Sequence, residues 1–227
     1  MATPPGCSRV PRGSHSTKPP ASSDPSKPLS GVLPMFNKLI LAAALATAST
    51  AAFADPVRYT IDPSHTDVIA QWSHFGFSNP TAHFGQAEGT IVYDADDVAA
   101  SSVEVTLPLA GMNSYTAKFD EHLRSSDFFD AAAFPVATFK STSVEAVGEG
   151  KLKVAGVLTI KDNSKPVVLD VTLNKVGENM GGQPTIGFDA TTTIKRTDFG
   201  VGMYAPAVSD EVRIRITTEA GVPKSAE

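Results

Sequence analysis

Cysteine is almost absent from this sequence of 227 residues, and the one copy, Cys7, lies near the amino terminus. A lone cysteine forms no internal disulfide, and its position leaves the patterned part of the chain without thiol chemistry. A glycine-rich phosphate loop, a GxSxG nucleophile motif and metal-ligand spacings are also missing. These absences argue against nucleotide-binding proteins, α/β-hydrolases and zinc enzymes with familiar motifs.

The first part of the chain differs in composition from the rest. Residues 1–34 are rich in Pro and Ser and show no apolar periodicity, so we expect a disordered extension, which a misplaced start codon would explain. Residues 35–54, MFNKLILAAALATASTAAFA, have a lysine near the start, an apolar run and a small-residue end, which is typical of a signal peptide. The apolar run is too short for a transmembrane anchor. We therefore expect cleavage after Ala54 and a periplasmic domain of residues 55–227.

Positive charge is scarce in that domain. The chain has 19 basic and 24 acidic residues, of which five basic and one acidic lie in the first 54. Residues 55–227 therefore hold 14 basic and 23 acidic residues, a net charge of −9. Phosphate backbones and anionic lipid surfaces repel such a domain. We expect no nucleic-acid partner and no stable membrane insertion.

Apolar and polar side chains alternate along most of the domain, which is the pattern of half-buried β-strands. Val103, Val105 and Leu107, for example, alternate with polar neighbours. Turn sequences such as GEGK and GENMGGQP join neighbouring segments and favour an antiparallel meander. We expect eight or nine strands, near residues 57–61, 67–75, 84–93, 102–108, 136–145, 151–161, 166–176, 184–195 and 210–218. The number depends on whether the first two form one strand bent at Pro63.

Eight antiparallel strands can close into a barrel or pack as a sandwich. Ala70, Gly156 and Ala190 have the inward parity of their large apolar neighbours. Inside a closed barrel, such small residues would leave space for one elongated apolar guest, as in lipocalins. Alternatively, bulky side chains opposite fill these gaps, and the pattern leaves both interpretations open.

One segment between the strands, residues 113–135, has a helical pattern. Tyr115, Phe119 and Leu123 recur every four residues, and His122 lies at the margin of this apolar stripe. A proline ends the segment. A helix inserted at this point is suited to closing one end of a barrel.

Four stretches carry a resemblance that spans about residues 59–220 in order. They are HTDVIAQWSHFGFSNPTAHFGQAEG from His65, FDEHLRSSDFFDAAAFPVATF from Phe119, VAGVLTIKDNSKPVVLDV from Val154 and IKRTDFGVGMYAPAVSDEVRIRI from Ile194. Together they resemble the YceI-like family of exported lipid-binding proteins. Two departures, Ala70 in place of a larger apolar residue and the KDNSKP turn, bear on cavity width or ligand choice.

The resemblance implies an all-β fold, an antiparallel eight-stranded lipocalin-like β-barrel with a short helical insertion capping one end. It implies a binding protein and not an enzyme, which stores or transports a polyisoprenoid, such as a quinone or prenyl phosphate, or a fatty-acid-like amphiphile. The bound lipid would be its ligand, and no further cofactor is expected. A homodimer formed through an exposed barrel flank is an additional expectation.

The candidate ligand-binding residues are of two kinds. His74 and His122 could meet a polar head group, because imidazole both donates and accepts, or could simply bond the backbone or a carboxylate. Arg196 could pair with a phosphate, although an internal pair with Asp198 is favoured. The remaining candidates would line a tunnel or fill a core, and their number beside small residues favours a tunnel. They are Val68, Ala70, Trp72, Phe77, Phe84, Phe128, Phe129, Phe134, Phe139 and Phe199.

The alternative is a histidine-dependent hydrolase or a metal-binding periplasmic protein. Ser64 and His65 are adjacent, which does not place a hydroxyl against a base. His74, His83 and His122 could meet around a zinc ion, yet their spacing follows no metal-ligand motif. A third hypothesis, a partner that hands quinone to a membrane oxidoreductase, finds no docking surface in the sequence.

Overall fold

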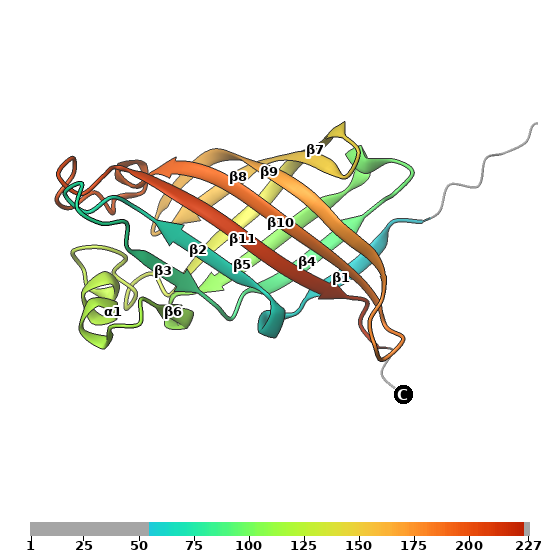
Figure 1. The fold of residues 1–227 in the computed structure, drawn as a ribbon, viewed down its shortest axis with the longest axis horizontal. Coiled ribbons are helices and arrows are strands. Elements are labelled where there is room, and N and C mark those ends of the chain that lie inside the picture. Colours follow the sequence, from blue (N-terminus) through green and yellow to red (C-terminus); the bar gives the residue numbers. More distant parts are fainter. Residues whose placement is uncertain (1–54, 225–227) are drawn as a thin grey trace, which may run out of the picture. The chain divides into compact units, whose positions relative to one another are not determined.

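Eight antiparallel strands close into a barrel in the computed structural model, which describes residues 55–224 (Figure 1). The strands are Val57–Ile61 (β1), Asp67–Gln71 (β2), Thr81–Phe84 (β3), Glu88–Tyr93 (β4), Ser102–Pro108 (β5), Met112–Asn113 (β6), Val136–Gly148 (β7), Lys151–Ile160 (β8), Asn163–Glu178 (β9), Pro184–Lys195 (β10) and Glu211–Gly221 (β11). The helical elements are α1, Ala117–Arg124, and the 3-10 turns Pro63–His65 (η1), Val98–Ala100 (η2), Leu109–Gly111 (η3) and Arg196–Phe199 (η4). The ring follows the order β1, β4, β5, β7, β8, β9, β10, β11 and closes through β11 and β1. The predicted barrel is confirmed, whereas the predicted extension and signal peptide lie outside the described residues.

Three neighbouring positions of the sheet are each occupied by two short strands. β1 and β2 lie end to end along one edge of β11, as the expected bend at Pro63 requires. In the next position of the sheet, β4 pairs with β1 and β3 pairs with β2. In the position after that, β5 pairs with β4 and β6 pairs with β3. At these breaks the Gly85 N–H donates to the Gly111 oxygen over 3.2 Å, and a side chain at Gly111 would lie 2.4 Å from the Gly85 oxygen. The one strand predicted over 84–93 is therefore two, because the sheet turns a corner there.

The barrel wall ends at β6 on one side of this corner. Within residues 55–224, β6 pairs with β3 and with no other strand, so its second edge needs other partners. Helix α1 follows β6 and buries Leu123 beside it. Arg124 donates from Nε to the Leu109 oxygen over 3.2 Å, and from Nη2 to the Met112 oxygen. The predicted helical insertion thus completes the wall at one end of the barrel.

A turn held by Asp120 sets the start of helix α1. The carboxylate accepts hydrogen bonds from the hydroxyl and the backbone N–H of Ser114, both 2.6 Å long, and these lower the pKa of Asp120. Tyr115 has a φ of 63°, which belongs to the left-handed region and excludes it from the helix. Only Phe119 and Leu123 of the predicted stripe therefore face the barrel, and Tyr115 is exposed.

The alternation seen in the sequence separates the interior of the barrel from its surface. Inward residues of the ring strands form a large cluster that includes Tyr59, Ile91, Val154 and Phe188. A second cluster joins β2, β3 and α1 around Val68 and other apolar side chains. No helix within residues 55–224 is long and apolar enough to cross a membrane.

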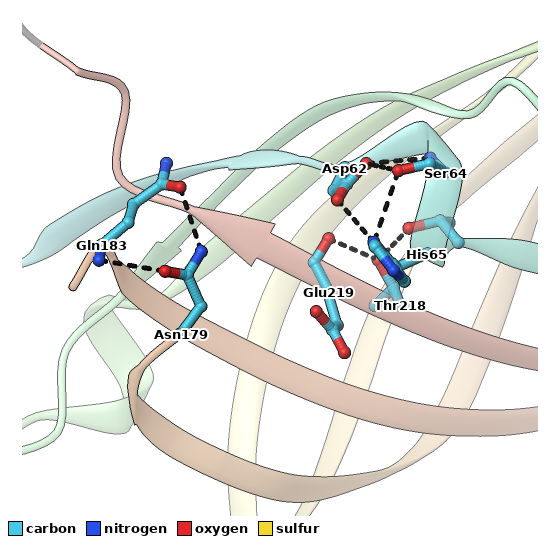
Figure 2. Close-up of polar contacts among 8 residues, drawn as sticks. Asp62, Ser64, His65, Asn179, Gln183, Thr218 and Glu219 are labelled. Atoms are coloured by element: carbon cyan, nitrogen blue, oxygen red, sulfur yellow. Dashed lines mark hydrogen bonds and ion pairs between the residues drawn. The ribbon is translucent and has the colours of Figure 1, made fainter. Parts of the chain in front are cut away.

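Asp62 holds the corner between β1 and β2 (Figure 2). Its Oδ1 accepts from the Ser64 N–H at 2.9 Å and the Ser64 hydroxyl at 2.5 Å, and its Oδ2 lies 2.7 Å from Nδ1 of His65. Hydrogen bonds from Ser64 and His65 lower the pKa of Asp62 to about 2, and the same carboxylate raises the pKa of His65. Inside the corner, the Thr66 and Thr218 hydroxyls are 2.8 Å apart. These contacts attach the start of β2 to β11.

We predict that Asp62→Asn lowers the pKa of His65 toward its ordinary value of about 6.5, because the amide removes the negative charge that stabilises the imidazolium. NMR titration of the imidazole signals measures this change. In the wild type, the raised pKa of His65 adds stability below about pH 6.5, which is lost as the pH rises through the folded-state pKa. The lowered pKa of Asp62 adds stability above about pH 4, which is lost as the pH falls toward 2. Glu219→Gln is the control and should lower the pKa of His65 less, because Glu219 acts on it only through its charge.

Candidate ligand-binding site

An apolar cavity of about 410 Å³ lies inside the barrel. Small-molecule sites commonly have volumes of about 300–1,000 Å³, so the interior offers room for a guest. Its walls come from the inward faces of both the ring strands and the short strands, and from α1. The apolar wall residues include Val68, Phe84, Ile91, Val103, Val105, Leu107, Leu123, Leu152, Val154, Leu158, Ile160, Leu169, Phe188, Val212, Ile214 and Ile216.

Polar side chains lie at both ends of this cavity, and three threonines, Thr66, Thr192 and Thr218, also line it. At the end where β11 begins, the lining includes His74, His122, Arg196 and Tyr204, which we call the mouth. His74 and Tyr204 are exposed to solvent, so the cavity communicates with the outside at the mouth. At the opposite end, where a loop joins β4 to β5, the lining includes Tyr93 and two serines. Because the mouth is open to solvent, a long apolar guest fits with its polar end there.

Most of the predicted site residues come together around the cavity. Those that line it are Val68, Ala70, Trp72, His74, Phe84, His122, Phe128, Phe129, Phe139 and Arg196. Phe77, Phe134 and Phe199 do not line it. Phe77 is exposed in the loop after β2, because this chain segment leaves the sheet before reaching it. Phe199 is fully buried in a separate cluster with Ala137, Ile160 and Val201, so it is part of a core and not of the cavity wall.

The three small inward residues have different surroundings. Ala70 lines the cavity, where it faces the space between Val68 and Trp72. The space beside Gly156 is occupied by Phe139 of β7, because a side chain added at Gly156 would lie 2.4 Å from the Phe139 ring. Ala190 is buried in the ring core and does not line the cavity. Phe139 therefore fills the place beside Gly156, and Ala70 alone of the three lines the cavity.

The two mouth histidines are held by aromatic neighbours. The His122 ring lies 4.9 Å from the Phe128 ring, and the His74 ring lies 4.7 Å from the Phe75 ring, both edge to face. The His74 backbone forms a bridge to Ser78 within the loop after β2 and a second bridge to Val208, which joins this loop to the loop before β11. Both imidazoles line the cavity, so they can offer a donor or an acceptor to a head group at the mouth.

Arg196 organises the loop that borders the mouth, and the expected pair with Asp198 is not formed. The guanidinium is buried and donates to four backbone oxygens, those of Ser209 (2.8 Å), Val201 (2.6 Å), Met203 (2.8 Å) and Val208 (2.8 Å). Burial lowers the pKa of Arg196, although the charge of nearby Asp210 opposes this effect. Because four of its five N–H groups serve the backbone, Arg196 has little hydrogen-bonding capacity left for a phosphate.

Asp210 supports the same loop from the other side. Its carboxylate accepts hydrogen bonds from the backbone N–H and the hydroxyl of Thr197, each 2.9 Å long. Partial burial would raise the pKa of Asp210, but these hydrogen bonds and the charge of Arg196 outweigh it and lower the pKa. The ionised carboxylate of Asp210 and the buried guanidinium of Arg196 therefore stabilise each other.

We predict that Arg196→Met lowers the free energy of unfolding by about 3 kcal/mol or more, because four backbone oxygens lose a donor at a buried position. Urea denaturation measures this difference. Arg213→Met, at an exposed position of β11, is the control and should change the free energy by less than about 0.5 kcal/mol. Unchanged stability with a loss of ligand affinity alone would show that Arg196 acts on the ligand and not on the loop.

Among the described residues, His65 and His83 are the other two histidines, and neither forms an enzyme site of a known type with Ser64. His83 points away from the cavity, and its Nδ1 lies 2.7 Å from the carboxylate of Asp67. At the corner, Ser64 and Asp62 both approach Nδ1 of His65, whereas a catalytic triad places the hydroxyl at Nε2. Among the residues that the structure describes, no group of three or more His, Cys, Asp or Glu side chains could hold a metal ion.

Two residues of the mouth, Tyr204 and Val208, do not follow from the sequence pattern. Tyr204 lines the cavity and lies 6.4 Å from the Phe128 ring, measured between ring centres. Val208 also lines it, from the same loop before β11. This loop has no alternation, so periodicity could not reveal which of its residues face inward. A tyrosine in an otherwise small and apolar stretch, GVGMYAPAVS, was the available signal.

Comparison with known proteins gives consistent results. Residues 59–220 match the model of the YceI-like domain family. A UPF0312 protein of Pseudomonas syringae pv. tomato is 37% identical over 193 residues, which cover 84% of this chain and 100% of that protein. The crystal structure of BcnA from Burkholderia cenocepacia has a TM-score of 0.65 at 27% identity and covers 70% of this chain and 99% of its own. A polyisoprenoid binding domain from Saccharophagus degradans has a TM-score of 0.58 at 16% identity, over 73% of this chain and 98% of its own, which shows a shared fold.

Proposed function

Because the chain belongs to the YceI-like family and its barrel encloses an apolar cavity, we propose that it binds a long-chain amphiphile of the polyisoprenoid type. The apolar tail lies along the barrel and the polar head group lies at the mouth beside His74 and His122. The observation that carries this proposal is the cavity itself, which has apolar walls and polar groups at its ends. The Saccharophagus degradans domain, described as polyisoprenoid binding, shares the fold and supports the same ligand class.

Burial of the tail supplies the binding free energy. Each buried CH₂ group contributes about 0.8 kcal/mol, so a tail of ten carbons gains several kcal/mol before the cost of association. The histidines add orientation, because they meet the head group only when the tail points inward. A quinone or a prenyl phosphate has the required combination of a long apolar tail and one polar end.

The proposal includes export and a carrier role. The signal-peptide pattern of residues 35–54, with cleavage after Ala54, supports a periplasmic location, where an apolar molecule needs a protein shell to cross an aqueous space. Storage or transport of the ligand there requires no catalytic residue. Pairing of two copies through a barrel flank remains a prediction.

Mass spectrometry of organic extracts from protein purified out of its native host tests the function directly. We expect a bound molecule with a long isoprenoid or alkyl tail in stoichiometric amount. A protein without extractable lipid, together with a crystal structure whose interior is filled by side chains, would contradict the proposal. The extract also identifies the head group.

Ala70→Phe should weaken binding of a benzoquinone with a ten-carbon tail by at least tenfold, because the ring takes the space of two or three CH₂ groups. Fluorescence of Trp72, the only tryptophan, measures this affinity, since its side chain lines the cavity. Ile69→Phe changes the neighbouring residue, which points to the outer face, and should leave the affinity unchanged. Equal affinities of the two variants would place the ligand outside the barrel.

His74→Ala combined with His122→Ala should weaken binding of the same quinone by about 5- to 150-fold, since each of the two lost hydrogen bonds is worth about 0.5–1.5 kcal/mol. Binding of a plain alkane of equal length should not change, because it has no head group. The same pair of substitutions tests the metal-binding alternative. Metal present in stoichiometric amount in the wild type and lost in the variant would favour that alternative over a lipid carrier.

A further inference from the structure

The mouth of the cavity is formed by two loops that are bonded to each other. They are residues 72–80, after β2, and residues 200–209, before β11, and we call them the mouth loops. The Phe75 N–H donates to the Ala207 oxygen over 3.1 Å, and the Ser209 N–H donates to the Ser73 oxygen over 2.9 Å. The Ser209 hydroxyl also accepts from the Ser73 N–H at 2.9 Å. The two loops therefore form one platform, at the same end of the barrel as α1 (Figure 1).

This platform exposes large apolar side chains. Phe77 is 92% exposed, Tyr204 is 58% exposed, Phe75 is 52% exposed and Met203 is 36% exposed. Single exposed apolar residues are common on protein surfaces, but four on two joined loops at the rim of a cavity are a cluster. Such a cluster is typical of a surface that meets another apolar phase or a partner.

The backbone holds two of these aromatic residues in an unfavourable conformation. Phe75 has a φ of 53° and Tyr204 a φ of 65°, both in the left-handed region that favours glycine. Each loop also has a glycine in the same region, Gly76 with a φ of 75° and Gly200 with a φ of 71°, so the aromatic residues adopt a conformation for which these loops elsewhere use glycine. Strain of this kind is retained where the position of a side chain matters.

The mouth loops also contain no charged side chain. Neither of the two loops has an Asp, Glu, Lys or Arg, although the remainder of residues 55–227 has a net charge of −9. A protein partner is usually recognised by a rim of complementary charges around an apolar centre. Exposed aromatic rings on loops that contain no charged residue are instead typical of membrane interfaces, where tyrosine and phenylalanine enter the head-group region.

We infer that the mouth loops dock on the surface of a lipid bilayer rich in uncharged, zwitterionic head groups. Phe77, Phe75 and Tyr204 enter the interface and place the mouth of the cavity against the lipid. Docking is peripheral and reversible, since no spanning segment takes part. Docking is inferred from these exposed side chains. Transfer of a lipid through the mouth additionally requires that the proposed function is correct.

Flotation with phosphatidylcholine vesicles tests the inference on the full exported chain. The wild type should float with the vesicles, and Phe77→Ser combined with Met203→Ser should reduce its partition coefficient at least tenfold. Met180→Ser is the matched control, because Met180 is fully exposed in the turn between β9 and β10 at the other end of the barrel. This control should float like the wild type. Vesicles with added phosphatidylglycerol should bind no better, because the domain is acidic.

Trp72 fluorescence separates this inference from the proposed function. The Phe77/Met203 variant should bind the quinone in solution as the wild type does, because neither side chain lines the cavity or contacts a mouth histidine. A wild type that stays with the buffer, or a variant that floats equally well, would overturn membrane docking even if quinone binding is intact. Loss of a dimer in the variant without any vesicle binding by the wild type would assign the surface to a second copy and also overturn it.

Discussion

β11 pairs along one edge with two successive strands, and the rest of the architecture depends on this division. Pairing with β1 near its carboxyl end closes the eight-stranded ring, which leaves no free edge there. Pairing with β2 over the earlier half turns the next strands away from the ring. The wall at this end therefore stops at β6, and a helix has to complete it. The ring determines one end of the cavity, and the departure of β2 determines the other.

Three cations stabilise this second end by donating to backbone oxygens. Arg124 donates to backbone oxygens beside β6, and Arg196 donates to those of the loop before β11. Lys161 donates from Nζ to the backbone oxygens of Phe128 at 3.0 Å and Gly200 at 3.4 Å. Irregular backbone has no ladder to satisfy its carbonyls, so side-chain donors replace the missing strand partners. This use explains why basic side chains lie near the mouth of an acidic domain without forming ion pairs there.

Alternation predicted the ring well, because each ring strand has one face toward the interior and one toward water. The predicted strand 102–108 coincides with β5, and 184–195 coincides with β10. The broken strands were harder to predict, since Gly85 and Gly111 mark a corner only when the sheet pairing is known. Wall residues such as Val68 and Trp72 followed from parity on β2. Tyr204 and the carbonyl partners of Arg196 did not, because they depend on a loop whose shape is set by contacts distant in sequence.

The family resemblance and the residue pattern contributed different parts of the result. The pattern left a barrel and a sandwich equally open, and the motifs resolved this choice. The pattern also left open whether small inward residues make a cavity, and only the three-dimensional structure answers this question. Phe139 fills the place beside Gly156, whereas Ala70 remains free on the wall. Small residues therefore indicate space only when the side chains across the barrel are known.

Because strand pairing stops at β6, the two parts of the barrel wall resist widening differently. Widening the ring would break main-chain hydrogen bonds along whole strands, which open cooperatively. Displacing the panel of residues 117–135 would break side-chain contacts and a few hydrogen bonds, such as those donated by Arg124 and Lys161. The ring is thus held by more main-chain hydrogen bonds than this panel, so we expect a wide guest to displace the panel before it widens the ring.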